Sequence, residues 1–577
     1  MGKSDARTKE RATVRFDLPA SRSGSDQGYH IVRGMVFMLA EPAATGTGDE
    51  NSLKYSIKWD EWLAESRIGP FPTAIVTVAA YLALQTVILS VLATWAGTGV
   101  GVDDAEQLIY LPYLWAGYGG SQPPLYTWIN WLAAQIFGTN IFTLKLVKYS
   151  VLFLAACSVF AAMRRFGYTK ATAAAAMLGL FTIPQIAWES QRALSHSVAV
   201  VGFCALLLLA MANLIERRSV IAYAVFGLAT AAAILAKYND VFLVAALVAA
   251  VLSLRELRGA ILDPKFAISV AVAILMLAPT TYWSLMHPAD LLARGEKFGI
   301  DLQQGRMTAA ATGAGKFLMG TFNFAVLPVL ICALAFALTG FRFSERRPKA
   351  PAREVLLWRT LALGLAMLAI LVLATGVTEV KARWLVPVLV ILPLAMAAYM
   401  ERLSPRGRDA QLLVIAAGAI IAVLLAPATW YFQINGTSGL SRMIRVDYAA
   451  LYRQLTADGP VKTAISDGAW VGNLRLIDEK LVALDQEVPN FDRLVQDPAV
   501  LVWLDRDDPR PVILEQLKKA GYEPDGQPRQ IMVPLLPSTD KSARPGAYVR
   551  LKRMAAEKAT AFEEGVSKGA EGGQEPD

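Results

Sequence analysis

Charged residues are scarce in this chain of 577 residues. Only 18% of the residues are Asp, Glu, Lys or Arg, whereas 55% are hydrophobic, and the mean hydropathy is +0.40. A soluble chain of this length would carry more charge. Stretches of about 20 apolar residues recur, each long enough to cross a bilayer core of roughly 30 Å. The composition therefore predicts a polytopic α-helical membrane protein.

Cysteine is rarer still. The chain has three cysteines, Cys157, Cys204 and Cys332, and each falls within an apolar stretch. Such placement is typical of cysteines that act as small buried hydrophobic residues. The sequence has no CxxC pair and no cluster of Cys and His, so no structural zinc site is expected. The net charge of +8 fits the basic cytoplasmic loops of membrane proteins and does not indicate nucleic-acid binding.

Eleven apolar segments are predicted as membrane spans. They lie at about 72–95, 146–163, 171–187, 194–214, 219–236, 240–254, 266–285, 317–340, 358–376, 384–400 and 411–430. The Lys- and Arg-rich loops all fall on one side, which predicts that this side is cytoplasmic. The loop from Thr98 to Leu144 contains no Lys or Arg and is predicted outside. The amino terminus is then predicted inside, and the tail after Trp430 outside.

These patterns divide the chain into four regions. Residues 1–70 mix charges with Gly and Ser, lack a signal-peptide pattern and predict a partly disordered cytoplasmic arm. Residues 71–435 are predicted as the transmembrane domain, in the inner membrane. Residues 436–555 predict a small extracytoplasmic α/β domain, because strand-like and helix-like runs alternate. Residues 556–577 are predicted to be disordered. The predicted strands lie at 461–467, 481–485, 499–505, 529–536 and 547–554, and an amphipathic helix at 511–522.

The acidic pair Asp103-Asp104 follows the first apolar segment. Adjacent carboxylates repel each other, and one that is partly desolvated near a membrane has a raised pKa. Such a carboxylate can accept a proton from a hydroxyl group as a general base. The structural alternative is a solvated loop or a helix N-cap. The pair is the strongest candidate for catalysis, because the loop that follows it is also unusual.

That loop continues with a run of aromatic residues and then Ser-Gln-Pro-Pro-Leu-Tyr, in which Gln122 and Tyr126 are candidate substrate- or acceptor-binding residues. A run this aromatic with so few charges favours an interfacial helix that lies along the bilayer. The alternative is an ordinary aromatic belt at the membrane surface.

A second polar group lies between the third and fourth apolar segments, at 188–197. Arg192 is three residues and His196 seven residues after Glu189, so the three side chains can share one helical face. Such a trio can bind a metal, a phosphate or a sugar. The alternative is a local ion pair with a capping histidine.

Cations on the predicted outer side form a third group. Lys237 lies in a very short outer turn, and Lys381 and Arg383 open the segment 384–400. Cations outside run against the usual charge bias of membrane proteins, which indicates an anionic ligand. Lys237 can also snorkel to the interface without any ligand. Carboxylates and cations together suit a substrate with a phosphate, a lipid tail and a leaving group.

Four motifs in this order resemble the superfamily C glycosyltransferases, in particular the bacterial protein-mannosyltransferase-like group. That group includes the lipid A aminoarabinose transferase and the rhizobial lipopolysaccharide galacturonosyltransferases. The motifs are VDDAEQ, SQPPLYTW, LAKYND and KARWLVPVLVILP. The resemblance covers residues 72–430 and fits the tail loosely.

The resemblance implies an inverting transfer of a sugar from a polyprenyl-phosphate donor to an envelope glycan or lipid acceptor outside the cytoplasmic membrane. It implies Asp103 as the general base, with Asp104 where relatives have Glu. Lys237, Lys381 and Arg383 would hold the donor phosphate. Relatives often have a second acid near residue 194, linked to metal binding, but Leu-Ser-His-Ser stands here.

A divalent metal is therefore left open as a cofactor, with Asp103, Glu189 and His196 as its candidate ligands. Other functions also stay open: a transporter or flippase for lipid-linked sugars, a protein O-glycosyltransferase, or an inactive relative that serves as an assembly partner. A transporter would show broken helices and charges at the membrane midplane, often in two repeated halves. The charges here gather at the predicted outer surface, and no repeat is evident.

Overall fold

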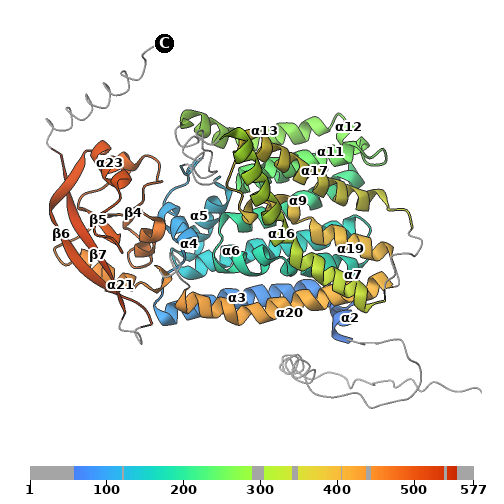
Figure 1. Ribbon diagram of the computed structural model, residues 1–577, viewed down its shortest axis with the longest axis horizontal. Coiled ribbons are helices and arrows are strands. Elements are labelled where there is room, and N and C mark those ends of the chain that lie inside the picture. The colour runs from blue at the N-terminus through green and yellow to red at the C-terminus, as the bar shows by residue number, and fades with distance from the viewer. Residues whose placement is uncertain are drawn as a thin grey trace, which may run out of the picture. The chain divides into compact units, whose positions relative to one another are not determined.

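The computed structural model describes residues 58–119, 123–288, 305–340, 348–403, 406–436, 443–537 and 542–554 (Figure 1). Residues 57–577 belong to one compact unit, in which a bundle of helices is followed by a sheet. Gln122, most of the predicted amino-terminal arm and the predicted tail at 556–577 lie outside the described residues. The boundaries of the four predicted regions stay predictions.

Seven helices in the described part of the chain are long and apolar enough to cross a membrane. They are α3 (Thr73–Ala96), α6 (Ile141–Arg165), α9 (His196–Arg217), α13 (Phe266–Met286), α16 (Arg306–Leu338), α17 (Ala352–Thr375) and α20 (Arg406–Asn435). An eighth span results if two helical pieces joined at a 73° bend are counted as one. These pieces comprise α7 (Lys170–Gly179), η1 (Leu180–Thr182), η2 (Gln185–Glu189) and α8 (Ser190–Arg192). The polytopic helical prediction is confirmed.

The predicted count of eleven spans is not confirmed, because three segments are short or broken. Segment 219–236 forms the 17-residue helix α10 (Val220–Ala236), and segment 240–254 forms the 12-residue helix α11 (Val241–Leu252). At about 1.5 Å per residue, α11 is roughly 18 Å long, well short of a bilayer core. Segment 384–400 is divided into α18 (Val386–Leu389) and α19 (Leu392–Arg402), each with a proline in its first turn. Proline lacks the amide hydrogen that would continue a helix.

Small residues set the spacing between neighbouring helices. A Cβ atom on Gly202 of α9 would lie 2.6 Å from Val151 of α6, and one on Gly227 of α10 would lie 2.3 Å from the Ser269 carbonyl of α13. Both helix pairs therefore approach at backbone distance, as small residues permit in membrane proteins. The resulting core around α6, α7 and α9 is rich in buried Ala, Val and Leu.

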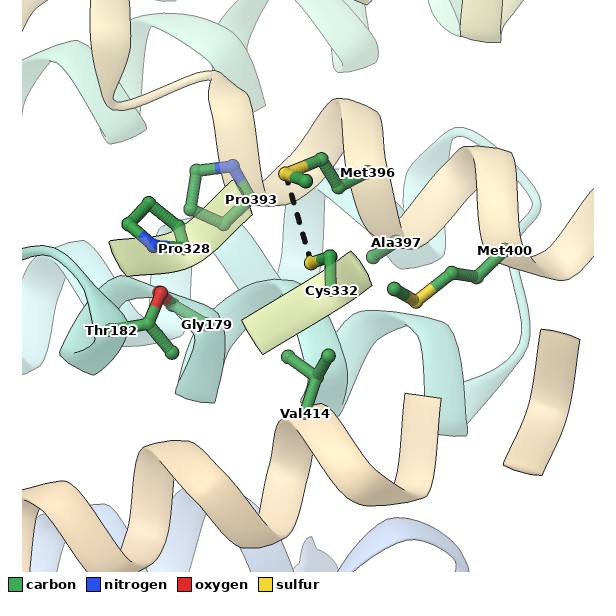
Figure 2. Close-up of a pocket in the computed structure, with 9 residues that line it drawn as sticks. All are labelled: Gly179, Thr182, Pro328, Cys332, Pro393, Met396, Ala397, Met400 and Val414. Atoms are coloured by element: carbon green, nitrogen blue, oxygen red, sulfur yellow. Dashed lines mark hydrogen bonds between the residues drawn. The ribbon is translucent and has the colours of Figure 1, made fainter. Parts of the chain in front are cut away.

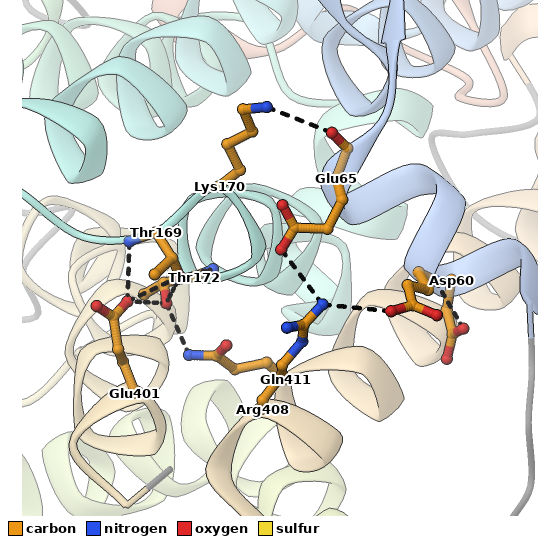
Figure 3. Close-up of polar contacts among 9 residues, drawn as sticks. Asp60, Glu65, Thr169, Lys170, Thr172, Glu401, Arg408 and Gln411 are labelled. Atoms are coloured by element: carbon orange, nitrogen blue, oxygen red, sulfur yellow. Dashed lines mark hydrogen bonds and ion pairs between the residues drawn. The ribbon is translucent and has the colours of Figure 1, made fainter. Parts of the chain in front are cut away.

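One end of the bundle is closed by polar contacts, shown in Figure 3. Arg408 of α20 pairs with Glu61 and Glu65 of the short helix α2 (Lys58–Glu65), at 3.3 and 3.6 Å. Lys170 of α7 donates to the Glu65 carbonyl at 3.4 Å, and Glu401 accepts hydrogen bonds from the first turn of α7. These residues come from loops that the charge bias assigns to the cytoplasm.

The sheet lies at the other end of the bundle (Figure 1). Its strands are β3 (Thr463–Ile465), β4 (Val482–Leu484), β5 (Ala499–Leu504), β6 (Tyr522–Pro534) and β7 (Ala543–Arg553), in the order β4-β3-β5-β7-β6. β3 pairs in parallel with β4 and β5, whereas β7 pairs antiparallel with β5 and β6. All six residues of β5 are buried, as expected for a central strand. The helix α23 (Pro511–Lys519) and the strands β3, β4 and β5 overlap the predicted segments, whereas β6 and β7 begin before the predicted starts at 529 and 547.

Short elements complete the described chain. They are β1 (Arg67–Ile68), β2 (Phe71–Pro72), α4 (Val102–Tyr110), α5 (Leu125–Phe137), η3 (Tyr238–Asp240), α12 (Gly259–Leu262), η4 (Ala382–Trp384), α21 (Tyr448–Leu455), η6 (Ala469–Leu476) and α22 (Phe491–Leu494). Of these, α4, η3, η4 and η6 matter most for the site, because they carry or support its charged residues.

Candidate active site

The acidic pair lies in the first turn of α4, and the sheet domain holds this helix in place. Asn473 of η6 accepts a hydrogen bond from the Val100 amide at 2.7 Å, and Arg475 donates to the Leu108 carbonyl at 2.5 Å. A Cβ atom on Gly472 would lie 2.1 Å from the Ala105 carbonyl, so η6 packs directly on the α4 backbone. The residues of η6 therefore hold the backbone on both sides of the acidic pair, at Val100 before it and at Ala105 and Leu108 after it.

Asp104 is buried and bound by two lysines of α6. Its carboxylate lies 2.9 Å from Lys148 Nζ and 3.2 Å from Lys145 Nζ, and all three side chains are at most 4% exposed. Burial alone would raise the pKa of Asp104, but Lys148 and Lys145 together lower it below the ordinary value. Asp104 is thus an ionised anchor of the site. The sequence named both members of the pair as catalytic candidates and Asp103 as the base; bound by two lysines, Asp104 has the environment of a structural anion.

Asp103 is only partly buried by its exposed area, but it lies deep among protein atoms. This burial raises the pKa of Asp103, and the charges of Arg383 and Lys148 partly oppose the rise. The Ser195 amide also donates a hydrogen bond to the Asp103 carboxylate. Asp103 thus has a raised pKa, as expected of a carboxylate that acts as a general base.

Two of the predicted cations meet at Asp103. The short turn with Lys237 is joined to η4, because Asn239 donates to the Trp384 carbonyl at 2.6 Å. Burial lowers the pKa of Lys237 to about 8, with Arg383 adding repulsion and Asp103 opposing it. Lys237, Arg383 and Asp103 come from three separate segments, and each acts electrostatically on the other two.

Lys381 has a different position from Arg383. Its side chain is exposed, and it lies near Glu379, which is also paired with Lys316 of α16. Those two lysines lower the pKa of Glu379, with Lys316 as the larger influence. Lys381 is therefore at the edge of the site, whereas Arg383 faces the carboxylate.

His196 is buried in a hydrogen-bonded chain with Gln107 and Thr127. Thr127 donates to Gln107 Oε1 at 3.0 Å, so the amide nitrogen of Gln107 faces His196 Nε2 at 3.1 Å. In the tautomer that carries its proton on Nδ1, His196 Nε2 accepts this hydrogen bond from Gln107. The Tyr126 ring lies 5.6 Å from the imidazole, and Tyr126 is buried. The structure thus brings Tyr126 and His196 to the inner wall of the site.

The predicted trio of Glu189, Arg192 and His196 is not formed. Glu189 and Arg192 make an ion pair at 2.7 Å, and Arg192 also lies over the Phe432 ring. The helix breaks after Arg192, and α9 begins anew at His196, so the three side chains do not share a helical face. The local ion pair, which was the structural alternative, is the arrangement observed.

The candidate metal set of Asp103, Glu189 and His196 is likewise not assembled. Within the described residues, no three His, Cys, Asp or Glu side chains are grouped so that they could hold a metal ion. Glu189 is paired with Arg192, and His196 Nε2 faces Gln107. These three residues therefore do not fit a metal centre in this conformation.

The aromatic loop after α4 is not the interfacial helix that its composition suggested. Residues 111–118 form turns and bends, held together by Tyr118, whose hydroxyl donates to the Tyr113 carbonyl at 2.8 Å and accepts from the Trp115 amide at 3.1 Å. The Tyr113 and Trp115 rings stack at 4.4 Å. These internal hydrogen bonds favour a compact turn at the expense of a regular helix.

The charged site is separate from the apolar cavity drawn in Figure 2. This cavity lies among α7, η1, α16, α19 and α20, and Cys332 and Met396 face each other there at 3.8 Å. Its lining offers almost no polar atoms to a sugar or phosphate. The cavity therefore has no part in the site around Asp103.

Sequence reasoning missed Lys145, Lys148 and Gln107. The two lysines lie three residues apart at the start of a span, on the side where the charge bias predicts few cations. The same signal had singled out Lys381 and Arg383. Gln107 gave no signal, since its partners lie 20 and 89 residues away in the chain.

Known proteins resemble this chain over most of its length. The family model of the dolichyl-phosphate-mannose-protein mannosyltransferases matches residues 121–283. The lipopolysaccharide core galacturonosyltransferases RgtB and RgtA of Rhizobium johnstonii are each 30% identical to it. The RgtB match covers 74% of this chain and 86% of RgtB, and the RgtA match covers 75% and 86%. The chain belongs to this family of bacterial membrane glycosyltransferases.

The fold of this glycosyltransferase agrees with the family assignment. The crystal structure of ArnT from Cupriavidus metallidurans bound to undecaprenyl phosphate matches with a TM-score of 0.50 and 15% identity. That match covers 82% of this chain and 97% of ArnT. The resemblance to superfamily C glycosyltransferases inferred from the four motifs is confirmed.

Proposed function

We propose that this glycosyltransferase moves a sugar from a polyprenyl-phosphate donor to a lipopolysaccharide or lipid acceptor, with Asp103 as the general base and inversion at the anomeric carbon. The observation that carries the proposal is the meeting of Asp103, Lys237 and Arg383 from three separate segments. A carboxylate beside two cations suits a reaction in which a hydroxyl loses a proton and a phosphate leaves.

The reaction is a single displacement. The acceptor hydroxyl oxygen attacks the anomeric carbon while its proton passes to the Asp103 carboxylate. The bond between that carbon and the phosphate oxygen breaks, and the polyprenyl phosphate leaves with the electron pair. Attack from the face opposite the phosphate inverts the anomeric configuration.

Arg383 and Lys237 stabilise the charge that develops on the leaving phosphate. A guanidinium binds phosphate through two parallel hydrogen bonds, whereas an ammonium acts as a point charge. Lys381, being exposed at the edge of the site, meets the donor phosphate first and guides it inward. Tyr126 and the His196 chain form the wall beside the reacting groups.

The relatives supply the substrates of the proposal. RgtB and RgtA are named for the transfer of galacturonic acid to the lipopolysaccharide core, and ArnT was crystallised with undecaprenyl phosphate. We therefore take the donor to be undecaprenyl-phosphate-linked galacturonic acid and the acceptor to be the lipopolysaccharide core. The site faces the outer side of the inner membrane, with the sheet domain on that side. Transport of lipid-linked sugars is not favoured, because these relatives are named as transferases.

Replacement of the base tests the proposal. A deletion strain that carries Asp103→Asn should produce lipopolysaccharide lacking one hexuronic acid residue by mass spectrometry, as the deletion strain itself does. The control is Glu515→Gln on the exposed face of α23, which should restore the parental glycan. Parental lipopolysaccharide from the Asp103→Asn strain, at equal membrane levels, would remove Asp103 from the mechanism.

A further inference from the structure

Four charged side chains form a buried group where α4 meets α6. Asp104 binds Lys148 through both carboxylate oxygens, at 2.9 and 3.1 Å, and binds Lys145 through one, at 3.2 Å. Asp103 precedes Asp104 on α4, and Lys148 is the α6 residue whose charge acts most strongly on it. The two lysines and two aspartates sum to zero charge. A buried charge group of this kind is stable only when each member is paired.

The two lysines are not equivalent in this group. They lie three residues apart on one face of α6, and both contact Asp104. Lys148 is wholly buried, spans both oxygens of Asp104 and acts on Asp103 as well. Lys145 touches one oxygen of Asp104 only. One lysine therefore serves both carboxylates, and the other serves the anchor alone.

We propose that Lys148 is a positioning residue for the general base: it fixes the first turn of α4 through Asp104, and its charge favours the form of Asp103 that accepts a proton. Lys145 only secures Asp104. This inference rests on the proposed role of Asp103 in transfer. It assigns a task to two buried lysines of α6 that have no role in the proposed function.

The other groups facing Asp103 define what Lys148 adds. Arg383 from η4 and Lys237 from the end of α10 approach the same carboxylate, and the Ser195 amide donates to it. Arg383 and Lys237 are also the proposed ligands of the donor phosphate, so their charges are shared with the phosphate once the donor is bound. Lys148 is held by Asp104 and stays with Asp103 throughout. The effect of the Lys148 charge on Asp103 is therefore the same before and after the donor binds.

The test compares Lys148→Met with Lys145→Met in purified protein, with undecaprenyl-phosphate-linked galacturonic acid and lipopolysaccharide core from the deletion strain. Transfer falls at low pH as Asp103 becomes protonated. Removal of a nearby cation raises a carboxylate pKa by about 1 unit or more. The low-pH part of the pH–rate profile, called the acid limb here, should move to higher pH by about that amount in Lys148→Met. At one pH unit below the new midpoint of this limb, the transfer rate should be roughly 10-fold lower than its plateau value. In Lys145→Met the limb should keep its parental position.

Two further variants keep the test decisive if a single lysine change prevents folding. Asp104→Asn combined with Lys148→Met and Asp104→Asn combined with Lys145→Met remove the same charges and differ only in which lysine remains. The limb should move up in the first and not in the second. Lys148→Arg should return the limb towards its parental position, because the charge is kept.

A purely structural role for Lys148 predicts another result. In that case each lysine variant lowers the transfer rate by a factor that is the same at every pH, and the acid limb keeps its parental position. This result would overturn the proposal. Failure of the proposed function is recognised separately, since the parental protein would then transfer no sugar from this donor at any pH.

Discussion

Raising the pH from 7 to 9 should weaken donor binding through loss of the charge on Lys237. The pKa of Lys237 lies at about 8, below the usual value of 10.5, because burial and then Arg383 disfavour the ammonium. A group with a pKa of about 8 is roughly 90% protonated at pH 7 and roughly 10% at pH 9. If only the ammonium form binds the phosphate, the KM for the donor rises about 10-fold over this range, most of it above pH 8.

The assay is the donor KM at pH 7, 8 and 9, with the acceptor saturating. Lys237→Arg is the matched variant, since a guanidinium stays charged throughout this range. In that variant the donor KM should stay flat between pH 7 and 9, whatever its absolute value. A parental donor KM that does not change up to pH 9, or an equal rise in Lys237→Arg, would refute the reasoning.

Two predictions concern the support of the site. Arg475→Met should lower the thermal unfolding temperature and the transfer rate, because it leaves the buried carbonyls of Leu108 and Leu481 without their donor, at about 1–3 kcal/mol each. Unchanged melting would show that η6 does not hold α4. Gly227→Ala should destabilise the bundle by about 1–3 kcal/mol, since its Cβ would lie 2.3 Å from the Ser269 carbonyl. Gly315→Ala on α16 is the control, with no atom within 4 Å of its Cβ. Equal melting shifts for the two glycine variants would contradict the close approach of α10 and α13.

Much of the site could be predicted from the sequence because charge in an apolar chain is conspicuous. Asp103, Lys237 and Arg383 stood out on the outer side of predicted spans, and the structure brings them together. These are local signals, and each can be recognised within a few residues of sequence.

The remainder depends on contacts between distant segments. The trio at Glu189, Arg192 and His196 was predicted from ideal helical spacing, but a short π-helix and a break at 193–195 change the direction of the side chains. His196 instead meets Gln107, 89 residues earlier in the chain. Lys148 lay inside an apparently apolar span, so its pairing with Asp104 appears only when α4 is placed against α6.

The charges at the site fit the proposed reaction from start to finish. Asp103, Lys237 and Arg383 together carry one positive charge while Asp103 is ionised, which matches a donor phosphodiester with one negative charge. After transfer, Asp103 holds the proton and the cations carry two positive charges. The leaving phosphate monoester then carries about −1.5 to −2. Negative charge thus passes from the base to the phosphate, and Arg383, which acts on both Asp103 and Lys237, lies where it stabilises the charge at either end. Because negative charge builds up on the phosphate as the bond breaks, Arg383 and Lys237 stabilise the transition state more than the bound substrate, which is what catalysis by electrostatic preorganisation requires.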